Sequence, residues 1–205
     1  MFEAKCLHLY LVTDEASRCR HGLLDTVRMA VEGGVTLVQH RCKKGDAATQ
    51  LAEARALKEL LDELGVPLII NDNLELALAV DAAGLHIGQL DMSPIEARKG
   101  LKPHQILGLT VNNAAQLQAV PSGIIDYLGI GPVFPTISKK NPAPTLGVAG
   151  LAQLVSSSPL PVVAIGGIRA QDAPIIRQQA GAAGVAIVSA ICAADDPRAA
   201  AQAFL

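Results

Sequence analysis

Short apolar runs recur along the chain, and each is followed by a polar or small residue. Runs of this length that are rich in Val, Ile and Leu and end at such residues are typical of buried strands. The predicted strands cover residues 8–12, 36–39, 68–70, 85–87, 106–109, 127–130, 162–165 and 185–188.

Segments with the spacing of an amphipathic helix separate these runs. The predicted helices cover residues 23–32, 47–64, 75–80, 94 to about 99, 113–120, 172–180 and 197–204. Gly33-Gly34 and Gly65 are predicted helix ends, because glycine tolerates the left-handed cap conformation. Ser93 is a predicted N-cap, with Pro94 as the first helical residue.

The alternation of strand and helix predicts an α/β fold with a parallel sheet. Eight units in 205 residues leave about 26 residues per unit, near the lower size limit of a (β/α)₈ barrel. We therefore predict a minimal TIM barrel, with residues 1–205 as a single domain. A doubly wound open sheet is the alternative, but its usual GxGxxG turn is absent from the first strand end, Thr13-Asp14-Glu15.

Composition narrows the class of partner. Aromatic residues make up 2% of the chain and the net charge is −2, so the sequence offers neither a base-stacking surface nor a basic face for nucleic acid. We expect small-molecule partners and leave oligomerisation open. No secretory signal and no apolar stretch of about 18 residues is found, which predicts a cytoplasmic protein without membrane contact.

The four cysteines show no CxxC pair and no zinc-ligand spacing. In a reducing compartment we expect them to remain thiols, without disulfides and without a zinc site. The five histidines show no ligand spacing either. We expect His86, on a predicted strand, to be a hydrogen-bonded interior residue rather than a base.

Two acids follow consecutive predicted strands. Asp72 comes after the strand at 68–70, and Asp91 comes shortly after the strand at 85–87. Because the carboxyl ends of parallel strands meet at one end of a barrel, the two carboxylates are placed to share a hard cation. The alternative is that each aspartate caps a helix or stabilises a turn.

The end of the second predicted strand carries two cations. Side chains alternate along a strand, so Gln39, Arg41 and Lys43 share one face, and His40 and Cys42 share the other. If the first face looks into the barrel, its cations lie beside the two acids. Magnesium held by carboxylates together with Lys and Arg suits a pyrophosphate. The alternative is a solvated strand end whose cations pair with the acids.

Candidate phosphate ligands follow the last predicted strands. Gly166-Gly167 lets backbone N–H groups approach an anion, and Val188-Ser189 ends the eighth strand. Loops after strands seven and eight form the common phosphate site of these barrels, although a tight strand-to-helix turn is the alternative. The irregular stretch 131–147 adds two hydroxyls and a cation, unless it is a solvated surface loop. These are Thr136, Ser138 and Lys139.

Through these residues, the chain resembles the group of TIM barrels that contains the thiamine-phosphate synthases and the thiazole tautomerases. The resemblance runs almost from end to end, and its specificity comes from several motifs in a fixed order. They are YLVTD at 10–14, VQHRCK at 38–43, LIINDNLELALAVDAAGLHIGQLD at 68–91, YLGIGPVFPTISKK at 127–140, VVAIGGI at 162–168 and GVAIVSAI at 184–191.

The resemblance implies an enzyme that joins hydroxymethylpyrimidine diphosphate to phosphoethylthiazole, giving thiamine phosphate and pyrophosphate. It implies Mg²⁺ on Asp72 and Asp91, and a dissociative mechanism in which pyrophosphate leaves first. The implied pyrophosphate ligands are Arg41, Lys43, Asn71 and Lys139, of which Arg41, Lys43 and Lys139 are the implied catalytic residues. The other implied substrate-binding residues are Gln39, Thr110, Thr136, Ser138, Gly167, Val188 and Ser189.

The sequence departs from the usual family pattern at a few positions. His40 replaces an apolar residue and Cys42 replaces an acid, whereas Thr110 and Ser138 keep a hydroxyl. Two other functions are consistent with the same barrel: a thiazole tautomerase, and a non-catalytic barrel that binds a phosphorylated metabolite. Retention of the acids and cations favours the synthase.

Overall fold

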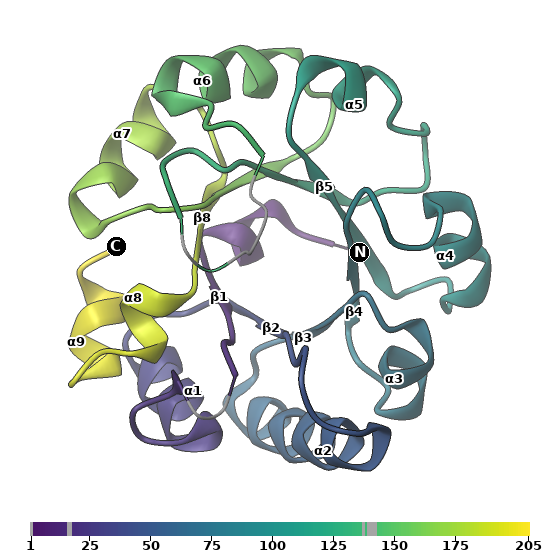
Figure 1. The fold of residues 1–205 in the computed structure, drawn as a ribbon, viewed down its shortest axis with the longest axis vertical. Helices are drawn as coiled ribbons and strands as arrows, with labels where there is room; N and C mark the ends of the chain where they lie inside the picture. The colour runs from purple at the N-terminus through teal and green to yellow at the C-terminus, as the bar shows by residue number, and fades with distance from the viewer. Residues whose placement is uncertain (1, 16–17, 137, 139–142) are drawn as a thin grey trace.

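The computed structural model describes residues 2–15, 18–136, 138 and 143–205, which form a closed barrel of parallel strands in the order β1 to β8 (Figure 1). Tyr10 pairs with Leu37 on one side and with Ala186 on the other, so β1 closes the barrel between β2 and β8. The predicted TIM barrel is confirmed, and the open sheet is excluded. The strands are β1 Leu9–Val12, β2 Leu37–His40, β3 Leu68–Asn71, β4 Gly84–Ile87, β5 Ile106–Val111, β6 Tyr127–Ile130, β7 Val162–Ile165 and β8 Gly184–Ile187.

Helices surround the strands on the outside of the barrel (Figure 1). The two longest of the helices predicted from periodicity, α1 and α2, have the predicted bounds. The helical elements are η1 Ala4–Leu7, α1 Leu23–Glu32, α2 Ala47–Leu64, α3 Leu74–Ala79, α4 Pro94–Gly100, α5 Ala114–Gln118, α6 Gly147–Ser157, η3 Ala170–Asp172, α7 Ala173–Gln178, α8 Ser189–Cys192 and α9 Pro197–Gln202.

The elements η1, α6 and α8 were not predicted, and η3 overlaps the predicted helix 172–180 only at Asp172. The α6 sequence GVAGLAQLVSS is rich in glycine and serine, whose helix propensity is low. Its Leu151 and Leu154 are buried in the core, so tertiary packing stabilises this helix. The elements η1 and α8 are single turns, too short for periodicity to reveal.

The predicted helix ends are mostly observed. Gly65 ends α2 in the left-handed region with φ of 67°. Gly33 ends α1 in a right-handed conformation, and the positive φ falls on Gly34 instead. Ser93 caps α4 by accepting a hydrogen bond from the N–H of Glu96, whose carboxylate accepts the N–H of Ser93 in return.

The core has two parts, one between strands and helices and one inside the barrel. Tyr10, Leu37 and Tyr127 belong to the interior part. Phe2 packs against it, with its ring stacked on that of Tyr127 at 5.7 Å between centroids. The N-terminal segment lies across the middle of the ring of strands in Figure 1, so it covers the amino end of the barrel. The opposite, carboxyl end is left for a cavity.

No helix within the described ranges is long and apolar enough to cross a membrane. All four cysteines are free thiols, and two of them, Cys19 and Cys192, are buried.

Candidate active site

A cavity of about 710 Å³ opens at the carboxyl ends of the strands. Every predicted site residue that the structure describes lies on its wall. These are Gln39, Arg41, Lys43, Asn71, Asp72, Asp91, Thr110, Thr136, Ser138, Gly167, Val188 and Ser189. Lys139 lies outside the described residues. The structure brings these side chains together, and their individual roles remain predictions.

The β2 strand end is held by hydrogen bonds from the neighbouring β1 loop. The N–H of Arg41 donates to the hydroxyl of Thr13 at 3.0 Å, and the N–H of Lys43 donates to the carboxylate of Glu15 at 3.2 Å. With the backbone fixed in this way, the side chains of Arg41 and Lys43 line the cavity. The intervening residue, Cys42, does not.

The two aspartates lie together at this side of the cavity. Asp72 has a φ of 61°, in the left-handed region that asparagine and aspartate tolerate best, and its N–H donates to the carbonyl of His86 at 2.9 Å. Its carboxylate forms an ion pair with Lys43. The Asp91 carboxylate accepts the N–H of Gly88 at 2.7 Å.

Burial raises the pKa of Asp91, and the neighbouring Asp72 carboxyl raises this pKa further. Two neighbouring carboxylates, whose ligand atoms are all oxygens, suit a hard divalent cation such as Mg²⁺. Neither acid is a helix cap, because Asn73 caps α3 and Ser93 caps α4. An ion pair between Lys43 and Asp72 is also expected if the acids and cations simply pair with one another. This contact is therefore consistent with both the metal site and simple ion pairing.

The opposite wall is built on two consecutive glycines after β7. Gly166 and Gly167 have φ of 101° and 64°, which L side chains rarely adopt. A Cβ on Gly167 would lie 2.3 Å from the carbonyl oxygen of Pro135, so the loop after β6 packs directly on this turn. Both loops line the cavity, and their backbone N–H groups and the Ser189 hydroxyl are candidate donors for an anion.

A chain of hydrogen bonds crosses the floor of the cavity. Gln39 donates to the Tyr10 hydroxyl at 2.8 Å, and this hydroxyl lies 2.9 Å from that of Tyr127. The Tyr127 hydroxyl contacts His86 Nδ1 at 2.9 Å, and His86 Nε2 contacts the Thr110 hydroxyl at 2.8 Å. The chain links β2, β1, β6, β4 and β5, which fixes the orientation of the Gln39 amide.

Burial lowers the pKa of His86 to about 4, so its imidazole is neutral at pH 7. The prediction that His86 is a satisfied interior residue is confirmed by its two hydrogen bonds. Gly108 provides the space, because a Cβ there would lie 2.2 Å from the ring of Tyr127. Sequence reasoning did not identify Tyr10 or Tyr127 as part of a polar network, since a tyrosine in an apolar strand has the pattern of an ordinary core residue.

Asn112 and Gln116 also line the cavity and were not predicted. The N–H of Asn112 donates to the Gln116 side chain at 2.7 Å, and the Asn112 amide group donates to the carbonyl of Gly131. The available signal was that Asn112 follows the predicted strand 106–109, whereas Gln116 lies within the predicted helix 113–120.

Comparison with known proteins identifies the family of this chain. A family model described as Thiamine monophosphate synthase matches residues 9–191. The chain belongs to this family. The resemblance drawn from the motifs is therefore confirmed, and the protein is an enzyme of the transferase class of thiamine biosynthesis.

Curated relatives agree over nearly the whole chain. A thiamine-phosphate synthase from Xanthobacter autotrophicus is 49% identical over 199 residues, covering 97% of this chain and 93% of the relative. One from Azorhizobium caulinodans is 48% identical over 190 residues, covering 93% and 89%.

Solved structures give the same picture. A thiamine phosphate pyrophosphorylase from Pyrococcus furiosus superposes with a TM-score of 0.88 at 33% identity, covering 98% of this chain and 95% of that one. A phosphoribosylanthranilate isomerase from the same organism reaches a TM-score of 0.67 at 11% identity, covering 96% of each chain, which is a likeness of fold alone.

Proposed function

We propose that this enzyme condenses hydroxymethylpyrimidine diphosphate with phosphoethylthiazole, releasing pyrophosphate and forming thiamine phosphate with Mg²⁺ as cofactor. One observation carries the proposal: a single cavity holds paired carboxylates and cations on one wall and an anion-accepting turn on the other. Such a cavity suits two phosphorylated substrates that react between the walls.

The diphosphate belongs on the wall formed by β2, β3 and β4. Asp72 and Asp91 would hold Mg²⁺, which when bound supplies positive charge to a departing pyrophosphate. Lys43 and Arg41 lie on the same wall and would supply fixed positive charge to the same oxygens, and Asn71 would donate a hydrogen bond from the end of β3. Lys139, outside the described residues, would add a further cation.

The thiazole phosphate belongs on the wall formed by the loops after β6, β7 and β8. Backbone N–H groups at Gly167 and Val188 and the hydroxyls of Thr136, Ser138 and Ser189 are the available donors there. None of them carries a formal charge, so this wall would hold a phosphate by directed hydrogen bonds, in contrast to the cationic wall opposite.

The floor of the cavity would orient the pyrimidine. Gln39 is fixed through Tyr10, and Thr110 is fixed through His86, so both side chains keep a defined direction. A dissociative reaction needs no enzymic nucleophile. Pyrophosphate departs with the bonding electrons, the pyrimidine methylene becomes cationic, and the thiazole nitrogen supplies the electron pair of the new C–N bond. Positioning and electrostatic stabilisation are then the enzyme's main contributions.

The test is pyrophosphate release by the purified protein with both substrates, with Mg²⁺ and then with a chelator. We expect release that requires both substrates and the metal, with thiamine phosphate formed in equal amount. Release with the diphosphate alone would indicate hydrolysis, and no release from folded protein would favour the tautomerase or the metabolite-binding function.

Asp91→Ala tests the metal assignment. We expect most activity to be lost while the barrel stays folded, as judged by circular dichroism and thermal unfolding. Asp195→Ala is the matched control, because this aspartate is exposed and lies far along the chain in the α8–α9 connection, away from the cavity wall. Near-parental activity of Asp91→Ala at saturating Mg²⁺ would remove this residue from the metal site.

A further inference from the structure

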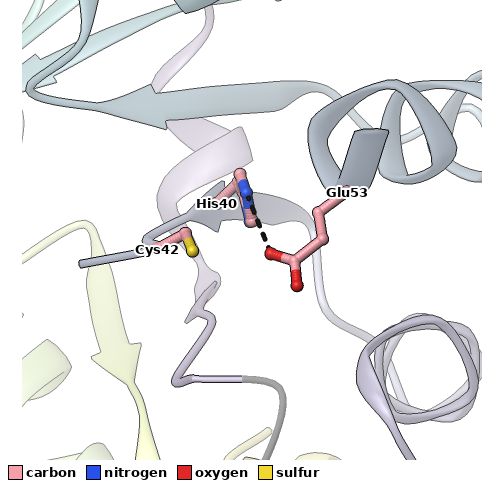
Figure 2. A group of neighbouring side chains, drawn as sticks. All are labelled: His40, Cys42 and Glu53. Atoms are coloured by element: carbon pink, nitrogen blue, oxygen red, sulfur yellow. Dashed lines mark ion pairs between the residues drawn. The ribbon is translucent and has the colours of Figure 1, made fainter. Parts of the chain in front are cut away.

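A second cluster of ligating groups lies on the outer face of β2. Neither His40 nor Cys42 lines the cavity, and Glu53 reaches toward them from α2 (Figure 2). His40 Nε2 lies 3.8 Å from the Glu53 carboxylate, and all three ligand atoms lie within 4.8 Å of one another. None of the three is among the residues that line the cavity.

The His40 ring is the unusual member of this cluster. Its side chain is only 2% exposed, and neither ring nitrogen has a hydrogen-bond partner among the described residues. A buried polar group left unsatisfied costs about 1–3 kcal/mol. The contact with Glu53 does not remove this cost, because 3.8 Å is too long for a hydrogen bond. The geometry therefore leaves both nitrogens of a buried imidazole without a partner, close to a thiol and a carboxylate.

We propose that His40, Cys42 and Glu53 bind one zinc ion, or a divalent transition metal with the same preference for nitrogen, sulfur and oxygen ligands. Tetrahedral zinc with ordinary bond lengths would place these ligand atoms about 3.3–3.7 Å apart. The observed separations, all within 4.8 Å, need a contraction of at most about 1.5 Å to reach these values. Three protein ligands leave a fourth position for water.

The charges of the site also fit. A thiolate and a carboxylate cancel the charge of a divalent cation, and a neutral imidazole adds none. Burial alone keeps the His40 imidazole neutral by lowering its pKa to about 4. Without a metal the cluster disfavours ionisation of the Cys42 thiol, because burial and the Glu53 charge raise the pKa of Cys42. A bound cation reverses that effect and deprotonates the thiol.

The cluster competes with one existing interaction. The Cys42 thiol donates to the carbonyl of Lys44 at 2.7 Å, and this bond would be lost on metal binding. In exchange the metal would join β2 to α2. Because Cys42 lies between Arg41 and Lys43 in the chain, the same bond would fix the strand end that carries both cations of the cavity wall.

A zinc site was not expected from the sequence, because the cysteines and histidines show no zinc-ligand spacing. Here His40 ends β2, Cys42 follows two residues later, and the third ligand is a glutamate on the following helix. Only the packing of α2 on β2 brings them together.

The test uses metal-free protein titrated with Co²⁺ and then with Zn²⁺. We expect one equivalent of Co²⁺ to produce a thiolate-to-cobalt charge-transfer band, and Zn²⁺ to displace it. Cys42→Ser should abolish the band and weaken Zn²⁺ binding at least about 100-fold, since even second-shell changes cost about 10- to 100-fold. Glu53→Gln should keep the band and weaken binding at least about tenfold.

Two controls locate the site. Cys6→Ser removes another partly exposed thiol and should leave the band intact. Asp91→Ala should also leave it intact, because its carboxylate belongs to the cavity. No band from folded parent protein, or a band that survives Cys42→Ser, would overturn the proposal, and loss of the band in Asp91→Ala would do the same.

Discussion

The two faces of the β2 strand end differ in how completely their polar groups are paired. On the inner face, Gln39 is hydrogen-bonded to Tyr10 and Lys43 is paired with Asp72. On the outer face, His40 has no hydrogen-bond partner among the described residues. The inner face is thus assembled before any ligand binds, whereas the outer face has ligand atoms that lack a partner.

The same contrast separates the two buried histidines. His40 and His86 are both almost fully buried, and burial lowers the pKa of each to about 4. His86 nevertheless has a hydrogen bond at each ring nitrogen, and His40 has none in the described part of the chain. Burial and pKa therefore do not distinguish a structural histidine from a candidate ligand, but a count of hydrogen-bond partners does.

The largest effect is expected on the inner face. Lys43→Ala should lower kcat/KM about 100- to 1000-fold, roughly 3–4 kcal/mol, because it removes fixed positive charge from the proposed leaving-group site. Lys44→Ala is the matched control, since this exposed lysine does not line the cavity. Steady-state kinetics of both variants measure this difference. An equal loss of kcat/KM in Lys44→Ala would show that the effect comes from the net charge of the protein and not from the position of Lys43.

Acid should destabilise the protein through both histidines. Each has a folded pKa near 4 against about 6.5 unfolded, so the unfolded state binds more protons between these values and stability falls as pH drops through this window. The full loss is roughly 3 kcal/mol per histidine. Urea unfolding in chelator at pH 7 and pH 4.5 measures it, and His40→Leu should show a visibly shallower dependence. An unchanged dependence in that variant would contradict the assignment to His40.

The hydrogen-bond chain on the inner side should be cooperative. Tyr127→Phe is expected to cost roughly 1–3 kcal/mol of unfolding free energy, because it leaves His86 Nδ1 without a partner and leaves the Tyr10 hydroxyl with Gln39 alone. The double variant with Tyr10→Phe should cost less than the sum of the single changes. Additive losses in urea unfolding would mean that the two hydroxyls act independently.

The smallest effect is expected for Cys42→Ser in chelator. Without metal this partly exposed thiol has one hydrogen bond to Lys44, which a serine hydroxyl can replace, so the unfolding free energy should change by less than about 0.5 kcal/mol. With saturating Zn²⁺ the parent should become more stable than the variant, because a ligand that binds only the folded state stabilises it. Equal melting temperatures of the parent protein with and without Zn²⁺ would argue against the zinc site at His40, Cys42 and Glu53.

Much of the barrel could be predicted from the sequence because its signals are local. Short apolar runs, a Ser-Pro helix start and glycine helix ends depend on neighbouring residues, so they placed β6, α1 and α2 within their observed bounds. The helix α6 was missed because its glycines and serines give a weak local signal, and its stability comes from leucines packed in the core.

The candidate site divides in the same way. Strand alternation and the position of each residue after a strand were enough to predict that Arg41, Asp72 and Gly167 would line one cavity, since a parallel barrel gathers its strand ends at one rim. Which groups pair across the barrel could not be predicted. The Tyr10–Tyr127 bond and the His40–Glu53 contact join residues from different elements, and only the closure of the barrel and the packing of α2 on β2 bring their atoms within reach.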